Sequence, residues 1–95
     1  MKGHLYKIQI EKIEDFKGQA VMEPPLVFTT RNHDDLMSIV EKMKSRPELS
    51  AEDATDLAIG LKLFGEVMLR NRELPLFADM QPALGSFIKK LKGRN

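Results

Sequence analysis

The stretch LAIGLKLFGEVML, residues 57–69, is long enough for several helical turns and is apolar on nearly every side. A helix of this kind belongs in a protein core, so we expect it to be the central helix of the fold. Leu61 and Phe64 are predicted to lie at the centre of its buried surface. Only Lys62 and Glu66 interrupt the apolar run, which leaves few polar side chains on this helix for chemistry.

The start of the central helix has a clear sequence signal. Ser50 is followed three residues later by Asp53, a pattern that resembles a capping box with Asp in place of the usual Glu. The helix is therefore predicted to span residues 51–71. Gly60 and Gly65 fall inside it, and each costs about 1 kcal/mol relative to Ala in a helix interior. Their presence predicts that another backbone packs closely against the helix there, with a hinge or a ligand approach as the alternative.

Composition predicts one soluble globular domain covering residues 1–95. The chain is 42% hydrophobic and 31% charged, which is near average for a domain with a single core. The net charge of +1 gives no global field that would attract nucleic acid or an anionic membrane. The chain has no cysteine, so disulfides and thiolate chemistry are excluded.

The sequence also gives an expectation about location. Residues 1–6 lack the apolar region of a signal peptide. The long apolar stretch is broken by Lys62 and Glu66, so we do not expect a membrane span. We expect a cytoplasmic protein.

The first third of the chain predicts a β-hairpin with a long loop. In the expected strand at residues 5–10, Tyr6, Ile8 and Ile10 alternate with polar side chains, and this period of two indicates a half-buried strand. The turn-forming residues 17–19 and the pair Pro24 and Pro25 then lead into residues 26–30, which are rich in strand-forming residue types.

A first helix is predicted to follow the hairpin. Asn32 is a candidate N-cap, and Asp34 and Asp35 would lie in the first turn beside the positive end of the helix dipole. Pro47 should stop the helix near Ser45. One face of this helix carries a stripe of apolar side chains, namely Leu36, Ile39, Val40 and Met43.

The last part of the chain predicts a crossing segment and a third helix. Pro75 disfavours helix at the residue before it, so residues 74–77 are expected to be extended, with their apolar side chains held against the core. The third helix should begin near the N-cap Asp79, tolerate Pro82 in its first turn and end before Gly93. Its buried face would consist of Met80, Leu84, Phe87, Ile88 and Leu91.

These elements predict an α+β fold, in which an N-terminal β-hairpin packs with three helices and the central helix is largely buried. Residues 2–6, 31–36, 60–69 and 75–77 together resemble the small bacterial domain-of-unknown-function family 3861. The similarity covers the whole chain. It implies a compact bacterial α+β protein, and the family has no established activity that could be assigned to particular residues.

The best candidate for a metal site is the cluster His33, Asp34 and Asp35, with His4 as a further ligand, because imidazole and carboxylates bind zinc and other divalent ions. No pair of ligands has the spacing that would place both on one helical face. The interpretation we favour is structural: Asp34 and Asp35 act as helix N-terminal anions, and His33 is exposed in the first turn. We therefore predict no metal and no cofactor.

The sequence also predicts no catalytic residue. A Gly-rich phosphate loop, a nucleophile elbow and a cysteine nucleophile are all missing. Asp53 and Asp56 lie near a helix start, where negative charge is structurally expected. The serines have no activating base nearby in the sequence, and they are Ser38, Ser45, Ser50 and Ser86.

A basic C-terminal patch makes weak nucleic-acid binding the alternative function. Between residues 70 and 95 the chain has six basic residues against only Glu73 and Asp79, and such an excess could contact phosphates. No aromatic side chains are interleaved with these cations to stack on bases, so we favour a solvated face and expect no nucleic-acid partner. The basic residues are Arg70, Arg72, Lys89, Lys90, Lys92 and Arg94.

The remaining class is a protein-interaction module. A two-stranded hairpin offers unpaired backbone groups at both edges and is marginal alone. Ile59, Leu63 and Val67 give the central helix more apolar surface than one face needs. Either the neighbouring helices bury both faces within one chain, or the sheet or this helix binds a second copy or another protein. The sequence thus favours a non-enzymatic interaction or regulatory module, with a homodimer as one form; a metal-binding protein or an enzyme comes third.

Overall fold

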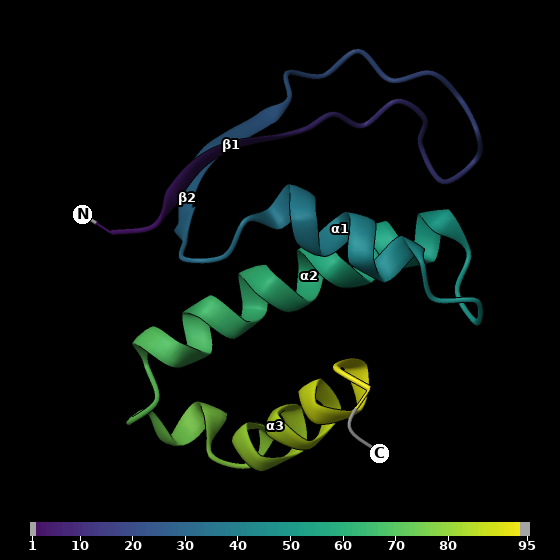
Figure 1. The fold of residues 1–95 in the computed structure, drawn as a ribbon. Coiled ribbons are helices and arrows are strands. Elements are labelled where there is room, and N and C mark those ends of the chain that lie inside the picture. Colours follow the sequence, from purple (N-terminus) through teal and green to yellow (C-terminus); the bar gives the residue numbers. More distant parts are fainter. Residues whose placement is uncertain (1, 94–95) are drawn as a thin grey trace.

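The computed structural model describes residues 2–93 and contains an antiparallel hairpin followed by helices (Figure 1). This order confirms the predicted α+β fold. Figure 1 shows three layers: the hairpin, then α1 with α2, then α3 on the far side of α2. The elements are β1 (His4–Ile10), β2 (Leu26–Asn32), α1 (Leu36–Lys44), α2 (Ala51–Arg70), the 3-10 turn η1 (Pro75–Phe77) and α3 (Met80–Leu91).

The hairpin has the predicted long loop, and its second strand extends two residues further than predicted. The strands pair from His4 with Asn32 to Ile10 with Leu26. Because directly opposite residues share a face, the even-numbered residues of both strands lie on one face. Gly3 marks the base of the hairpin. Its φ is +102°, and a Cβ at this position would lie 3.0 Å from the carbonyl oxygen of Asn32, so this close approach requires glycine.

The N-cap of α1 is Asp35, and the prediction that Asn32 caps this helix is wrong. The Asp35 Oδ1 accepts hydrogen bonds from the backbone N–H of Met37, at 3.1 Å, and of Ser38, at 3.5 Å. Asn32 instead ends β2, and its side chain bonds elsewhere. At the other end of the helix, Ser45 is the C-cap, as predicted from the proline that follows.

The helix α2 begins as predicted. The Ser50 Oγ accepts a hydrogen bond from the backbone N–H of Asp53 at 3.0 Å, which satisfies one of the unpaired donors of the first turn. The helix ends at Arg70, where Asn71 is the C-cap and its side-chain Nδ2 donates to the carbonyl of Val67 at 2.8 Å.

The core lies where α1 crosses the first half of α2. Met43 is 8% exposed, Ala54 is 0% and Ala58 is 1%; the two alanines allow α1 to approach closely. Leu61 is half-buried and Phe64 is 38% exposed, so the prediction that they form the centre of the buried surface is wrong. Partly buried apolar residues complete the core, namely Ile39, Val40, Leu49, Leu57 and Leu91.

The burial of α2 is therefore uneven. Its buried residues are Ala54, Ala58 and Met68, whereas Val67 and Leu69 are exposed. Gly60 and Gly65 have no atom within 4 Å of a built Cβ, which contradicts the prediction that a backbone packs closely there. The neighbouring helices of the same chain leave much of the second half of α2 uncovered.

The segment after α2 differs from the extended crossing that we predicted. Residues 75–77 form the 3-10 turn η1, with Pro75 in its first turn. Leu76 is 79% exposed and does not hold the segment to the core. Phe77 does so in part, since its ring meets Phe64 edge to face, with centroids 6.2 Å apart.

The helix α3 has the predicted bounds but not the predicted cap. It begins at Met80, and the Asp79 side chain makes no capping hydrogen bond. At its other end Gly93 has a φ of +78°, the left-handed conformation expected after a helix. Across residues 2–93, no helix has both the length and the hydropathy needed to cross a membrane.

The position of the core gives a stability prediction. Met43→Ala should lower the free energy of unfolding by about 2 to 5 kcal/mol, because it removes a buried side chain and leaves a cavity. Met37→Ala is the control, because Met37 lies on the exposed face of the same helix. This variant should change the free energy of unfolding by less than about 0.5 kcal/mol. Urea denaturation of both variants measures the difference, and equal effects would contradict this placement of the core.

Candidate functional site

The hairpin is joined to the helices through a tyrosine hydroxyl. Tyr6 comes from β1 and projects from the face shared by the even-numbered residues. Its hydroxyl donates to the carbonyl of Asp34 at 3.0 Å and accepts from the backbone N–H of Leu36 at 2.9 Å. One side chain thereby provides the hydrogen-bond partner of the Asp34 carbonyl and of the Leu36 N–H, in the turn that opens α1.

A buried asparagine makes the second connection. Asn32 is 1% exposed. Its Nδ2 donates to the carbonyl of Lys62 in α2 at 3.1 Å, and its Oδ1 accepts from the backbone N–H of Asp34 at 3.0 Å. This amide fixes the end of β2 against the middle of α2.

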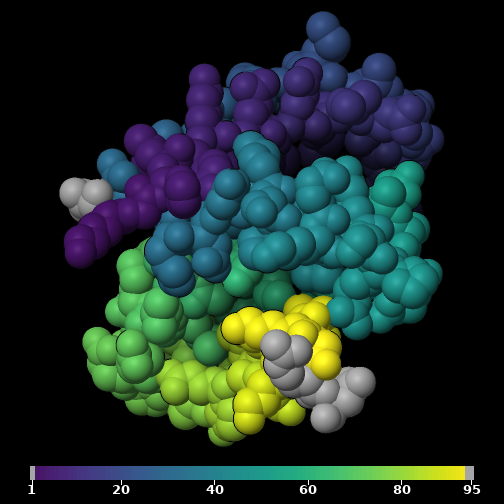
Figure 2. Space-filling model, viewed as in Figure 1, coloured from purple at the N-terminus to yellow at the C-terminus, as the bar shows by residue number. Residues whose placement is uncertain are grey.

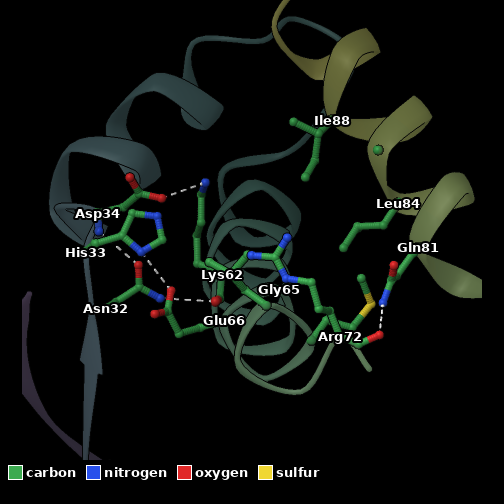
Figure 3. A pocket seen from close by; sticks show the side chains of 13 residues that line it. Asn32, His33, Asp34, Lys62, Gly65, Glu66, Arg72, Gln81, Leu84 and Ile88 are labelled. Atoms are coloured by element: carbon green, nitrogen blue, oxygen red, sulfur yellow. Dashed lines mark hydrogen bonds and ion pairs between the residues drawn. The ribbon is translucent and has the colours of Figure 1, made fainter. Parts of the chain in front are cut away.

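Two ion pairs lie beside these hydrogen bonds (Figure 3). The Lys62 Nζ is 2.9 Å from the Asp34 Oδ2, and the His33 Nδ1 is 3.0 Å from the Glu66 Oε1. Lys62 and Glu66 are one helical turn apart, so both point toward the turn between β2 and α1. The sequence carried a signal for this contact, because these are the two polar residues that interrupt the apolar stretch.

The Lys62 ammonium changes the acidity of its partner. Its hydrogen bond to the carboxylate holds the pKa of Asp34 below the usual range, although partial burial opposes the shift. The positive charges of Lys62, His33 and Lys92 act in the same direction as the hydrogen bond. Asp34 is therefore an anion at neutral pH, and the pair with Lys62 is a charged one.

The ion pairs form one wall of a cavity of about 330 Å³, here called the polar pocket. Figure 3 shows its second wall, where Leu84 and Ile88 of α3 face α2 across the opening. Arg72 and Gln81 close one end, and the Gln81 Nε2 donates to the Arg72 carbonyl at 2.8 Å. The pocket is thus apolar between two polar ends.

A second cavity, of about 480 Å³, lies between α1, α2 and α3 and is here called the helix groove. It shares Lys62 and Ile88 with the polar pocket. Its apolar lining comes from all three helices and consists of Ile39, Met43, Leu61, Ile88 and Leu91. Four cations also line it, namely Lys42, Arg46, Lys62 and Lys92.

Arg46 closes the groove at the end of α1. Its Nη1 donates to the carbonyl of Leu91 at 2.9 Å, while its Nη2 lies 2.8 Å from the Glu48 Oε2. This contact brings the last turn of α3 against the segment that follows α1, and Figure 2 shows yellow and teal segments meeting at the surface. No local pattern in the sequence predicts it, because the partners are 45 residues apart.

The candidate metal ligands are each engaged by another group. Asp35 caps α1, Asp34 pairs with Lys62 and His33 pairs with Glu66. His33 is exposed, as predicted. Asp34 and His33 both precede the first turn of α1, so neither lies within that turn as predicted. Within residues 2–93, no three His, Cys, Asp or Glu side chains gather in a way that could hold a metal ion.

The predicted basic patch is divided by the fold. Arg70 and Arg72 lie at the end of α2, and Lys89, Lys90 and Lys92 lie at the end of α3. Because α3 runs back along α2 (Figure 1), the two groups occupy opposite ends of this helix pair. Arg94 lies outside the described residues.

The two cavities present side chains for binding a ligand. The lining side chains are apolar, cationic or already paired, and none of the four serines lines either cavity. Two of those serines have structural roles: Ser50 caps α2, and the Ser45 Oγ donates to the Lys42 carbonyl at 2.6 Å. The arrangement suits binding of an apolar group that carries negative charge beside it.

Comparison with known proteins agrees with this fold. A model of the family described as a domain of unknown function with a solved structure, DUF3861, matches residues 4–93. The fold is similar to the crystal structure of a protein of unknown function from Pectobacterium atrosepticum, with a TM-score of 0.80 and 32% sequence identity, over 96% of this chain and 98% of that one. No curated protein shows a significant match.

The buried asparagine can be tested by substitution. Asn32→Ala should lower the free energy of unfolding by about 1 to 3 kcal/mol, because the Asp34 N–H loses its buried partner. Asn71→Ala removes an exposed side-chain bond to a helix carbonyl and serves as the matched control, with a smaller loss. Urea denaturation gives both values, and an Asn32 variant as stable as its control would show that this bridge is unimportant.

The pair between Lys62 and Asp34 predicts a pH dependence. A lowered pKa in the folded state stabilises the protein above the unfolded pKa of about 4, and the effect is lost as the pH falls through the folded value. Asp34→Asn should therefore be less stable than wild type near pH 7, with a difference that shrinks in acid. Asp56→Asn, an exposed aspartate of α2, is the control. Urea titrations from about pH 2.5 to 7 measure this, and a pH-independent difference would contradict the assignment.

Proposed function

The chain belongs to the DUF3861 family, and we propose that it is a non-enzymatic protein-interaction or regulatory module that works as a homodimer. Its apolar hairpin surface would form the contact. We define this surface by side chains of the strands and the loop, namely Ile10, Ile13, Phe16, Met22, Leu26 and Phe28. A cytoplasmic location is part of the proposal, in keeping with the charged residues Lys62 and Glu66 within the long apolar helix.

The observation that carries the proposal is the amount of surface that one chain exposes. Its accessible surface is 7672 Å², whereas a folded monomer of 10.8 kDa is expected to expose about 5,500 Å². The radius of gyration of 15.8 Å also exceeds the value of about 12 Å expected for a compact domain of this length. A standard interface buries roughly 800 Å² on each partner, so the excess is large enough for a stable dimer.

The exposed surface has the composition of an interface. The six side chains of the apolar hairpin surface are between 37% and 106% exposed. Large contiguous apolar patches are rare on monomeric proteins and mark interaction sites. A second copy is the simplest partner, because a twofold axis places this surface of each chain in an identical contact with the other chain. The hairpin would then gain the packed face that two strands need.

Sedimentation equilibrium tests the proposal. At micromolar concentration the mass should be twice the 10.8 kDa of one chain. Ile10→Lys places a charge on the apolar hairpin surface and should shift the equilibrium toward monomer. Gln9→Lys is the matched control, because the neighbouring residue lies on the opposite face of β1.

A monomer mass for wild type up to about 100 μM, well above the concentrations at which stable homodimers assemble, would refute the homodimer. So would a dimer that both lysine variants leave unchanged, because the contact would then lie away from this surface.

A further inference from the structure

The loop of the hairpin is an ordered projection. Residues 11–25, here called the arm, continue the ribbon through a bridge between Glu14 and Ala20. At its turn the Asp15 N–H donates to the Gln19 carbonyl at 2.8 Å. The Asp15 Oδ1 accepts from the backbone N–H groups of Lys17 and Gln19, both at 2.9 Å. The arm therefore has a defined turn before it meets any partner, which reduces the entropy lost on binding.

The turn of the arm presents an aromatic side chain to solvent. Phe16 follows Asp15 directly in the turn and is 106% exposed. A phenylalanine buries about 150 to 250 Å² when it enters a pocket, and such anchors supply most of the binding energy of an interface. Ile13 and Met22 lie behind it and are also largely exposed.

The helix groove has the complementary shape and charge. Its volume of about 480 Å³ is ample for one phenyl ring with a neighbouring aliphatic side chain. Its lining is apolar with four cations and includes no carboxylate. Two of these cations, Arg46 and Lys62, already pair with Glu48 and Asp34, so Lys42 is the cation on which the contact depends. The arm has the opposite net charge, because it carries four acidic residues against two lysines. Its acidic residues are Glu11, Glu14, Asp15 and Glu23.

We propose that the arm of each copy enters the helix groove of the other, with Phe16 on the apolar floor and Glu14 beside Lys42. This inference rests on the proposed homodimer and specifies its contact. The exchange is reciprocal, so one twofold axis generates both contacts and closes the assembly. Both copies together have more than 4,000 Å² of excess surface by the monomer relation, within the range of obligate dimers.

The polar pocket is a poorer acceptor for the arm than the groove. Its charges are largely satisfied within the chain, by the pairs of Lys62 with Asp34 and of His33 with Glu66. The groove adds Lys42, whose ammonium makes no ion pair among residues 2–93 and which lies on the exposed side of α1. A carboxylate entering the groove meets attraction, whereas one entering the polar pocket also meets two carboxylates.

Substitution of Phe16, in the turn of the arm, tests its role as the anchor. Phe16→Ser should raise the dimer dissociation constant by about 30-fold or more, as expected for a central aromatic anchor. Leu76→Ser is the control, because it removes a largely exposed apolar side chain from η1, and it should leave the constant unchanged. Circular dichroism checks that both variants remain folded.

The groove is tested by charge. Lys42→Glu should weaken the dimer about tenfold, through repulsion of the arm, whereas Lys44→Glu, at an exposed site of the same helix outside the groove, should not. Glu14→Lys should weaken it similarly. Mixing Lys42→Glu with Glu14→Lys pairs opposite charges at both contacts, so native mass spectrometry should find mainly mixed dimers.

Three outcomes decide the question. An excess of mixed dimers supports arm exchange. A statistical mixture of dimers, or a wild-type affinity for Phe16→Ser, overturns arm exchange but leaves the proposed homodimer standing. A wild-type protein that is monomeric overturns both.

Discussion

The arrangement of the hairpin and the helices depends on one buried amide. Asn32 ends β2 and binds the carbonyl of Lys62 on one side and the N–H of Asp34 on the other. A buried polar group is stable only when its partners are in place, so this side chain admits one position of the strand relative to α2. The Tyr6 hydroxyl, the capped start of α1 and the ion pairs of Lys62 and Glu66 all follow from that position.

Features encoded by neighbouring residues could be predicted from the sequence. The cap of α2 at Ser50, the alternation along β1 and the glycine after α3 each depend on a few consecutive residues, and the structure has them as predicted. The α+β class followed from their order. The sequence predicts Asn32 as the cap of α1, whereas the structure uses Asp35. Both residue types cap helices, and the competing tertiary bond of Asn32 is made to a residue 30 positions away.

Burial and the candidate site could not be predicted in the same way. An apolar pattern shows which side chains avoid water but does not show which chain covers them. The pattern of α2 therefore suggested a helix enclosed by its own domain, whereas Phe64 and Val67 remain exposed. The helix groove could not be predicted either, since it is assembled from three helices and from Arg46, whose partner is 45 residues away. Within the sequence these groups are separate and none of them indicates a cavity.

The long separation between Asn32 and Lys62 has a consequence for synthesis. The hairpin leaves the ribosome before the helices, but its anchoring carbonyl is 30 residues behind it. At the usual elongation rate of 5 to 20 residues per second, this delay is about 2 to 6 s. During that time the nascent chain displays two unpaired strand edges and an apolar ribbon that has nothing to pack against, the kind of segment that aggregates or recruits chaperones. The order of the elements means that the hairpin is synthesised before the helix that secures it.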